Sequence, residues 1–313
     1  MALEKQIIAC IMCTKDRPSY VLDFLENIKE QSLLPNLLLI IDSSLDNETE
    51  EIVKSHTLNN DLEMHLFKSL PGLPRQRNMG ITKLLEMTRD PNRCMVAFLD
   101  DDVVIEENYF RILGSEIKRD FPFSGITGQP ENGRVFGAKF LVRKFFLMDS
   151  KRDGCILPSG HTTTPRADKS LKHVDWMCGL SMNIPLQILE KIRFDEKIRM
   201  YGEDIEMSIR LREFGPIYCS SRLRYQHRNA MESRQSAFRV TTYTFGIRWK
   251  MSQLYPTIIK KRAIIWSLLG SGMLDFGLLI SGKNTKDRIS RLLGMAHFLK
   301  NIIARKDPTE PYK

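Results

Sequence analysis

The first hundred residues alternate between continuously apolar segments and segments whose apolar residues are spaced as on one face of a helix. Four segments are expected to be buried strands: residues 6–13, 37–41, 63–67 and 95–99. Between the first two, Val21, Leu25 and Ile28 recur at helical spacing. Strands that are apolar throughout and alternate with helices are typical of a parallel sheet covered on both faces. The pattern therefore predicts an α/β fold.

The alternation continues less regularly beyond this region. The later pattern predicts a helix over 109–117, a strand over 125–130, an irregular segment over 131–172, a strand over 174–182, a helix over 185–192, a helix from about 203 to 214 and a strand over 217–224. The helix that begins near residue 203 should stop at Gly215-Pro216, because glycine and proline end helices.

Polar residues follow three of the predicted strands at the point where each ends. They are Thr14, Asp42 and Asp100. In a parallel sheet the carboxyl ends of the strands share one edge, and ligands bind there. We therefore expect these three residues to lie at one rim of the sheet.

Asp100, Asp101 and Asp102 form a run of three consecutive carboxylates directly after the strand predicted at 95–99. Three neighbouring acids repel one another, so a positive group is expected to join them. A divalent cation that also holds phosphate oxygens meets this need, because Mg²⁺ and Mn²⁺ prefer carboxylate ligands. The alternative is an exposed acidic turn that caps a following helix.

Two further acids, Glu203 and Asp204, lie at the start of the helix predicted from about residue 203. The helix dipole favours an ionised carboxylate at this end. The pair is therefore either a functional carboxylate site or the ordinary enrichment of acids in a first helical turn.

The six cysteines show no framework of spacings. Cys10 and Cys13 form a lone CxxC inside the first predicted strand, where alternation would point their side chains to opposite faces. Buried thiols in a reducing compartment are therefore favoured over a zinc or redox site. The polar first residues do not resemble a signal peptide, and we expect a cytoplasmic protein.

All of the excess positive charge lies at the carboxyl end of the chain. The net charge of the whole chain is +9, whereas residues 236–313 carry fourteen Lys and Arg against four acids. We expect this segment to meet an anionic partner, either a membrane surface or a nucleic acid. Because its basic residues are interleaved with long aliphatic runs and few aromatic residues, a membrane is favoured and no nucleic acid is expected.

Residues 263–280 form an apolar segment at the low end of the length that spans a membrane. Asp275 lies within it, and an acid at the centre of a span costs about 2.5–3.5 kcal/mol. Residues 288–306 form a basic amphipathic segment. We expect both to be helices that lie on the anionic cytoplasmic leaflet. The alternatives are a helical cap with a solvated basic face and a true membrane span.

Seven short motifs occur in an order that resembles a known family. They are Thr14-x-x-Arg17-Pro18, Asp42-x-Ser44-x-Asp46, Arg77-Asn78-x-Gly80, Asp100-x-Asp102, Trp176-x-x-Gly179, Phe194-Asp195 and Gly202-Glu203-Asp204. Over residues 6–230 this order resembles the family-2 glycosyltransferases of the GT-A fold. The resemblance implies a GT-A catalytic domain over 1–235, with a mixed, mainly parallel sheet flanked by helices, and a basic helical extension over 236–313.

The resemblance also implies roles for individual residues. It assigns the nucleotide sugar to Thr14, Arg17, Asp42, Arg77, Asn78, Asp100 and Asp101. Within this set, Asp42 would accept the ring N–H of uracil, Asp100 would contact ribose or the donor sugar, and Asp101 would be a variable spacer.

The remaining assignments concern the metal, the base and the sugar. The resemblance implies that Asp102 and His227 bind Mn²⁺ or Mg²⁺, which would offset the charge of the leaving diphosphate. Asp204 is the expected general base, with Glu203 as its competitor. A third pair, Trp176 and Gly179, would shape the pocket for the donor sugar and the acceptor.

These implications predict an inverting, metal-dependent transferase that moves one sugar from a nucleotide donor, UDP-linked, to a saccharide or lipid-linked acceptor. Phe245 stands where processive synthases of the family have the Gln of their Gln-x-x-Arg-Trp segment, which favours single addition. We expect action in cell-surface glycan and polysaccharide biosynthesis, at the inner face of the cell membrane. Two alternatives are a metal-dependent nucleic-acid-processing enzyme and a non-catalytic nucleotide-sugar-binding protein.

Overall fold

The structure is a computed structural model that describes residues 6–118, 122–131, 137, 139–199, 201–228, 236–282 and 284–310. It divides into two compact units. The sheet unit comprises residues 1–133, 164–199 and 203–229, and the helical unit comprises residues 134–163, 200–202 and 230–313. The boundary expected between residues 235 and 236 lies outside the described residues. The helical unit takes in residues 134–163, which we had expected to belong to the catalytic domain.

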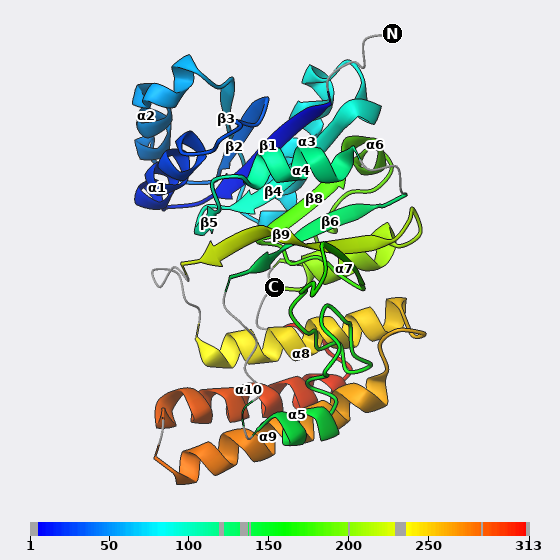
Figure 1. The fold of residues 1–313 in the computed structure, drawn as a ribbon. Helices are drawn as coiled ribbons and strands as arrows, with labels where there is room; N and C mark the ends of the chain where they lie inside the picture. The colour runs from blue at the N-terminus through cyan, green and yellow to red at the C-terminus, as the bar shows by residue number, and fades with distance from the viewer. Residues whose placement is uncertain are drawn as a thin grey trace. The chain divides into compact units, whose positions relative to one another are not determined.

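A nine-stranded mixed sheet forms the centre of the sheet unit (Figure 1). Its strands are β1 (Ile7–Thr14), β2 (Leu37–Asp42), β3 (Met64–Lys68), β4 (Cys94–Asp100), β5 (Val103–Ile105), β6 (Gly125–Pro130), β7 (Leu171–Val174), β8 (Ser181–Pro185) and β9 (Ile217–His227). They run in the order β3-β2-β1-β4-β8-β6-β9-β5, with β7 paired to β9. The strands β3, β2, β1 and β4 are parallel, and β8 joins β4 in the opposite direction. The predicted α/β fold with a mainly parallel half is confirmed.

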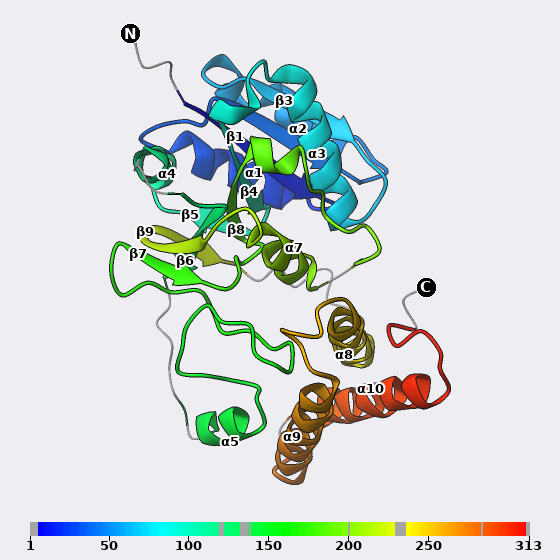
Figure 2. The ribbon, with the colours of Figure 1, turned by 90° about the vertical axis from the view of Figure 1, so that its right-hand side faces the viewer.

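Helices cover both faces of this sheet (Figures 1 and 2). The helices of the sheet unit are α1 (Pro18–Lys29), α2 (Glu48–Ser55), α3 (Leu73–Met87), α4 (Tyr109–Ile117), α6 (Leu186–Leu189) and α7 (Glu203–Leu211), with short 3₁₀ turns at Thr57–Asn60 and Pro91–Arg93. One buried cluster unites α1, α2 and α4 with one face, and a second unites α3, α6 and α7 with the other.

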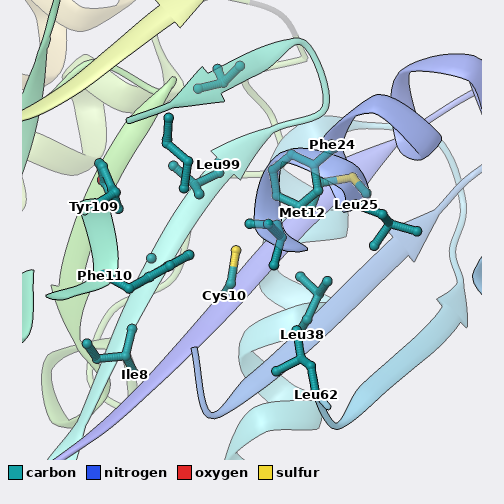
Figure 3. Close-up of a cluster of buried hydrophobic side chains, with 14 of the residues drawn as sticks. Ile8, Cys10, Met12, Phe24, Leu25, Leu38, Leu62, Leu99, Tyr109 and Phe110 are labelled. Atoms are coloured by element: carbon teal, nitrogen blue, oxygen red, sulfur yellow. The ribbon is translucent and has the colours of Figure 1, made fainter. Parts of the chain in front are cut away.

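The alternation of side chains along β1 divides its residues between these two clusters. Cys10 and Met12 pack with Phe24 of α1 and Phe110 of α4 (Figure 3). Cys13 belongs to the cluster on the opposite face. The expected separation of the two thiols is confirmed, and both cysteines are buried and free.

Two predicted elements differ from the structure. The strand expected over 174–182 is divided, because β7 ends at Val174 and β8 begins at Ser181. The amide of Ser181 donates to the carbonyl of Cys178, so the chain turns between these strands. After the acidic triplet the chain forms the short strand β5 rather than a capped helix.

Four helices form most of the helical unit: α5 (Phe140–Phe145), α8 (Ala237–Leu254), α9 (Lys261–Ile280) and α10 (Thr285–Ile303). The helices α8 and α10 approach closely at Gly294, where an added Cβ would lie 2.6 Å from the carbonyl oxygen of Phe238. Among the described residues, α9 is the one helix long and apolar enough to cross a membrane by length and composition.

Packing in the sheet unit predicts a large effect at Gly80 of α3. A Cβ added there would lie 2.7 Å from Cγ2 of Ile11 on β1, which leaves no room for a methyl group. Because overpacking a well-filled core costs about 1–3 kcal/mol, we expect Gly80→Ala to lower the free energy of unfolding by that amount in denaturant titrations.

Gly114 of α4 provides the matched control. A Cβ there would lie 3.7 Å from Cδ1 of Ile8, an ordinary contact. Since alanine favours a helix over glycine by about 0.5–1 kcal/mol, Gly114→Ala should be neutral or stabilising. Equal changes in the two variants would contradict the close approach of α3 to β1.

Candidate active site

The register of the sheet brings three strand ends to one rim. Thr14 pairs with Asp42 across β1 and β2, and Cys13 pairs with Asp100 across β1 and β4. The expectation that Thr14, Asp42 and Asp100 share one edge is therefore confirmed. Gln76 of α3 holds this edge together, because its amide donates to the backbone carbonyls of Thr14 and Ile41.

The three consecutive aspartates have three different partners. Asp100 accepts a bond of 3.0 Å from Arg77. Asp101 accepts bonds from the Thr14 hydroxyl at 2.8 Å and from the Arg17 guanidinium at 2.9 Å. We had expected Asp101 to be a spacer, and this was wrong: its buried carboxylate positions Thr14, which ends β1, and Arg17, which follows that strand.

The third aspartate, Asp102, lies beside His227. Strand β5 pairs with β9 so that Val103 is opposite His227. This register brings the His227 imidazole to Asp102, the residue before Val103. The Nε2 atom of His227 lies 3.2 Å from an Asp102 carboxylate oxygen. The hydrogen bond to Asp102 raises the pKa of His227 above its usual value. The structure thus brings together the two residues that the sequence assigned to a metal, although they are 125 positions apart.

Arg77 lies inside the protein rather than on an open surface. Its side chain is 1% exposed and stacks at 5.3 Å on the ring of Phe194. The guanidinium donates to Asp100, to Glu203 at 3.2 Å and to the carbonyl of Gly179 at 3.1 Å. Arg77 is therefore an internal counter-ion that joins the acidic triplet to the start of α7. Its contact with a nucleotide stays a prediction.

Two other predicted nucleotide contacts are engaged elsewhere. The amide of Asn78 donates to the carbonyl of Phe194 and accepts from the amide of the same residue, which fixes the segment before Glu196. Asp42 is fully buried and accepts bonds from Ser44 and from Lys68 at 2.8 Å. Ligand contacts of Asn78 and Asp42 also stay predictions.

Trp176 and Gly179, the pair expected to shape the sugar pocket, have different surroundings. Trp176 is 7% exposed, so most of its ring is in contact with protein. The backbone of Gly179, in contrast, lies against the charged groups. Its amide donates to Asp204 at 3.1 Å, and a Cβ there would lie 3.3 Å from a guanidinium nitrogen of Arg77. Glycine permits this close approach of backbone to carboxylate.

The two acids that begin α7 have different surroundings. Glu203 is buried and bonded to Arg77. Asp204 is more exposed, and its carboxylate accepts from the amides of Gly179 and Ile205. Burial and the neighbouring Asp204 raise the pKa of Glu203 to about 7. Burial also raises the pKa of Asp204, although these backbone donors oppose the shift.

The donor set at Asp102 and His227 fits a divalent cation that takes only two protein ligands. Two adjacent ligands of an octahedral Mg²⁺ lie roughly 3.0 Å apart, since each is about 2.1 Å from the ion. The separation of 3.2 Å between the two side chains is close to this value. The described residues contain no set of three or more His, Cys, Asp or Glu that could hold a metal. Water and phosphate oxygens would therefore complete the shell, as Mg²⁺ prefers.

Two residues of the site had not been predicted from the sequence: Lys68 and Gln76. Lys68 ends β3 opposite Asp42, so it is a polar residue at a fourth strand end of the same rim. This position at a strand end is the signal in the sequence that could have identified Lys68. The role of Gln76 depends on two carbonyls from different strands, and no local pattern indicates it.

The raised pKa of Glu203 predicts how stability changes with pH. Its pKa is about 7 in the folded protein against a usual 4.5, so the folded protein holds a proton that the unfolded chain has released. Stability from this group is therefore greatest below about pH 4.5 and falls as the pH rises to about 7. We expect Glu203→Gln to reduce the fall in melting temperature measured between about pH 5 and pH 7.5 in chelator.

Glu196→Gln is the control for this experiment. Hydrogen bonds from Asn78 and Arg75 lower the pKa of Glu196, so its contribution is complete across the same interval and is lost only in more acidic solution. The control should retain the fall of the wild type. An equally steep fall in Glu203→Gln would show that another group is responsible.

Comparisons with known proteins agree with this geometry. The family model for glycosyl transferase family 2 matches residues 9–163. No curated protein matches the sequence. The structure is similar to mannosyltransferase PcManGT from Pyrobaculum calidifontis, solved with GDP-Man and Mn²⁺, at 12% identity and a TM-score of 0.58, covering 97% of this chain and 89% of that chain.

A second similar structure is TarS from S. aureus, at 13% identity and a TM-score of 0.50, with 91% of this chain and 55% of that chain covered. The chain therefore spans about half the length of TarS. At these identities the structural likeness concerns the fold alone. The family match indicates an activity, which the fold alone does not. It includes the ends of β1, β2 and β4 with the whole acidic triplet. Residues 9–163 belong to glycosyl transferase family 2, and the protein is a glycosyltransferase of the GT-A fold.

Proposed function

We propose that the protein is an inverting, metal-dependent glycosyltransferase that moves one sugar from a UDP-linked donor to a saccharide or lipid-linked acceptor in cell-surface glycan biosynthesis. The observation that carries this proposal is the charged network around Arg77. It joins the acidic triplet, through Asp100, to the start of α7, through Glu203. A group suited to holding a diphosphate and a carboxylate suited to proton transfer are thereby parts of one site.

Asp204 is the proposed general base. In a single displacement the acceptor oxygen bonds to the anomeric carbon as the bond to the diphosphate breaks, and the configuration inverts. The acceptor's proton passes to the carboxylate. A raised pKa makes Asp204 a better proton acceptor, because basicity near the working pH favours transfer. Glu203 is less suited, since it is buried and bonded to Arg77.

Asp102 and His227 are the proposed metal ligands. When bound, Mn²⁺ or Mg²⁺ would stabilise the negative charge that develops on the leaving diphosphate. Arg17 adds a fixed positive group at the same rim, because Asp101 holds its guanidinium 3.9 Å from the nearer carboxylate oxygen of Asp102. A diphosphate would therefore meet positive charge from two directions.

The uridine base is proposed from the position of Asp42. PcManGT was solved with GDP-Man, so the fold is compatible with other bases. Asp42 is paired with Lys68, and a uracil N–H would replace that ammonium as the partner of the carboxylate. The ammonium also donates to the backbone carbonyl of Asp46, which would retain it beside the base.

We also propose that residues 236–313 associate with the anionic inner face of the cell membrane. The fourteen Lys and Arg of this segment, against four acids, support it. A transferase located there would reach a lipid-linked acceptor without releasing it from the bilayer.

Replacing the proposed general base, Asp204, should separate nucleotide binding from the transfer reaction. We expect Asp204→Asn to bind UDP with unchanged affinity but to lower kcat roughly 10²–10⁴-fold, because general-base catalysis contributes about that much. The measurement is release of UDP from a panel of UDP-sugars, beside titration calorimetry with UDP.

Glu203→Gln tests the competing assignment in the same assay. If it abolished turnover while Asp204→Asn retained near-normal kcat, the base would be Glu203. Loss of UDP binding in Asp204→Asn would instead place this carboxylate in the nucleotide site.

Removing a metal ligand should weaken the response to Mn²⁺. We expect UDP with Mn²⁺ to raise the melting temperature of the wild type, because a ligand that binds only the folded state stabilises it. In Asp102→Ala, the Mn²⁺ concentration needed for half of this effect should rise at least roughly tenfold, since loss of even outer partners of a metal costs that much. His227→Ala should act in the same direction.

Asp61→Ala, at an exposed aspartate on the same unit, is the matched control and should respond as the wild type does. Full activity in a chelator, or in Asp102→Ala, would contradict the metal assignment. Stabilisation by GDP in place of UDP would overturn only the proposed uracil base of the donor and would leave the metal assignment intact.

A further inference from the structure

One face of α9 is apolar and open to solvent from Trp266 to the carboxyl end of the helix. Five large apolar side chains recur at alternating intervals of three and four residues and are 38% to 75% exposed: Trp266, Leu269, Met273, Phe276 and Ile280. The spacing places them in a single row. At 1.5 Å per residue the row extends for roughly 21 Å. Single exposed apolar residues are ordinary on a soluble protein, whereas a continuous row indicates a binding surface.

The exposed row continues onto a neighbouring helix. The indole of Trp266 donates to the carbonyl of Phe145 on α5, and the two rings lie 5.4 Å apart. Phe145 is itself exposed, as is Leu141 on the same helix. The ring of the next residue, Phe146, fills the space beside Gly270 and fixes α5 against α9. We call this surface, formed by Trp266, Leu269, Met273, Phe276 and Ile280 of α9 with Leu141 and Phe145 of α5, the apolar face.

The opposite side of α9 carries the charge. Asp275 is buried and accepts bonds from Arg288 at 2.5 Å and from Arg291 at 2.9 Å, both on α10. If α9 spanned a bilayer, this ion cluster would enter the hydrocarbon with it, at a high cost. If α9 instead lies in the plane of the surface, its exposed row enters the lipid and the cluster stays within the protein.

Basic residues continue the apolar face at the amino-terminal end of α9. Lys260, Lys261 and Arg262 line one surface pocket together with Ile259 and Pro256. Arg262 lies four residues before Trp266, so it extends the exposed row with a cation. Lysine and arginine beside an apolar face match the anionic headgroups that lie above the acyl chains.

From this arrangement we infer that α9 and α5 lie in the plane of an anionic lipid surface, with the apolar face inserted between headgroups and Lys260, Lys261 and Arg262 bound to those headgroups. The partner is a lipid bilayer rather than a second copy of the chain, because a cationic edge would repel its own copy. The inference rests on the proposed membrane association and refines it. It adds α5, which the sequence had placed in the catalytic domain, and it does not depend on the identity of the sugar.

Vesicle binding by the full chain tests the inference. The triple variant Leu269→Gln, Met273→Gln and Phe276→Gln removes the middle of the apolar face without touching Asp275. We expect the wild type to float with vesicles of phosphatidylcholine and phosphatidylglycerol, and more weakly with phosphatidylcholine alone. The triple variant should bind at least roughly a hundredfold more weakly, since each buried apolar side chain contributes roughly a tenfold factor or more.

A matched control changes exposed leucines elsewhere. Leu22 and Leu33 of the sheet unit are 42% and 45% exposed, similar to the residues of the row. The double variant Leu22→Gln and Leu33→Gln should float as the wild type does. Stabilisation by UDP and Mn²⁺, measured on every variant, reports whether the sheet unit is folded. It also separates failure of the donor assignment from failure of the lipid assignment.

Three outcomes would overturn the inference. Vesicle binding by the triple variant equal to that of the wild type would exclude the apolar face. Resistance of the bound wild type to alkaline carbonate would indicate a membrane span rather than an in-plane helix. A wild-type dimer without lipid that becomes a monomer in the triple variant, with no vesicle binding by either, would assign the face to a second copy of the chain.

Discussion

The site depends on one buried guanidinium. Arg77 is almost completely enclosed and bonded to Asp100, Glu203 and the carbonyl of Gly179. Without it, two carboxylates from distant parts of the sequence, Asp100 and Glu203, would lie near each other in a buried region with no positive group between them. Removing one partner of a buried ion pair typically costs about 3–5 kcal/mol, because the remaining charge is left without compensation. The acidic triplet and α7 therefore form one site only while Arg77 is in place.

The position of Arg77 depends in turn on the packing of α3. One helical turn after Arg77, Gly80 lies against Ile11 with no room for a larger side chain. This contact lets the helix axis approach the sheet, so that the first turn of α3 reaches the strand ends. Gln76, in that turn, bonds to the carbonyls that end β1 and β2. Arg77 and Gln76 thus serve one arrangement: the first compensates the charge of the rim and the second fixes its backbone.

Sequence reasoning predicted the parts of this site that depend on local pattern. Continuous apolar runs located β1, β2 and β4, and the parallel rule then placed Thr14, Asp42 and Asp100 at one edge. Sequence reasoning could not predict which side chains are in contact, because Arg17 and Asp101 are 84 positions apart and Arg77 and Glu203 are 126 apart. Asp101 was mistaken for a spacer for this reason. The contact of His227 with Asp102 follows from pairing of β5 with β9, and a three-residue strand gives almost no periodic signal.

The helical unit shows the opposite limit, because its strong apolar pattern had three explanations. Residues 263–280 are apolar on every side, so composition alone allows a span, a core helix or an interfacial helix. In the structure, the two sides of α9 have different surroundings. One side packs at Gly270 against Phe146 and encloses Asp275 between two arginines of α10. The other side is the apolar face, whose side chains are 38% to 75% exposed. A continuous row of exposed apolar side chains is conspicuous, since its exposure to water is unfavourable. An in-plane lipid surface removes them from water and still leaves the buried ion cluster intact.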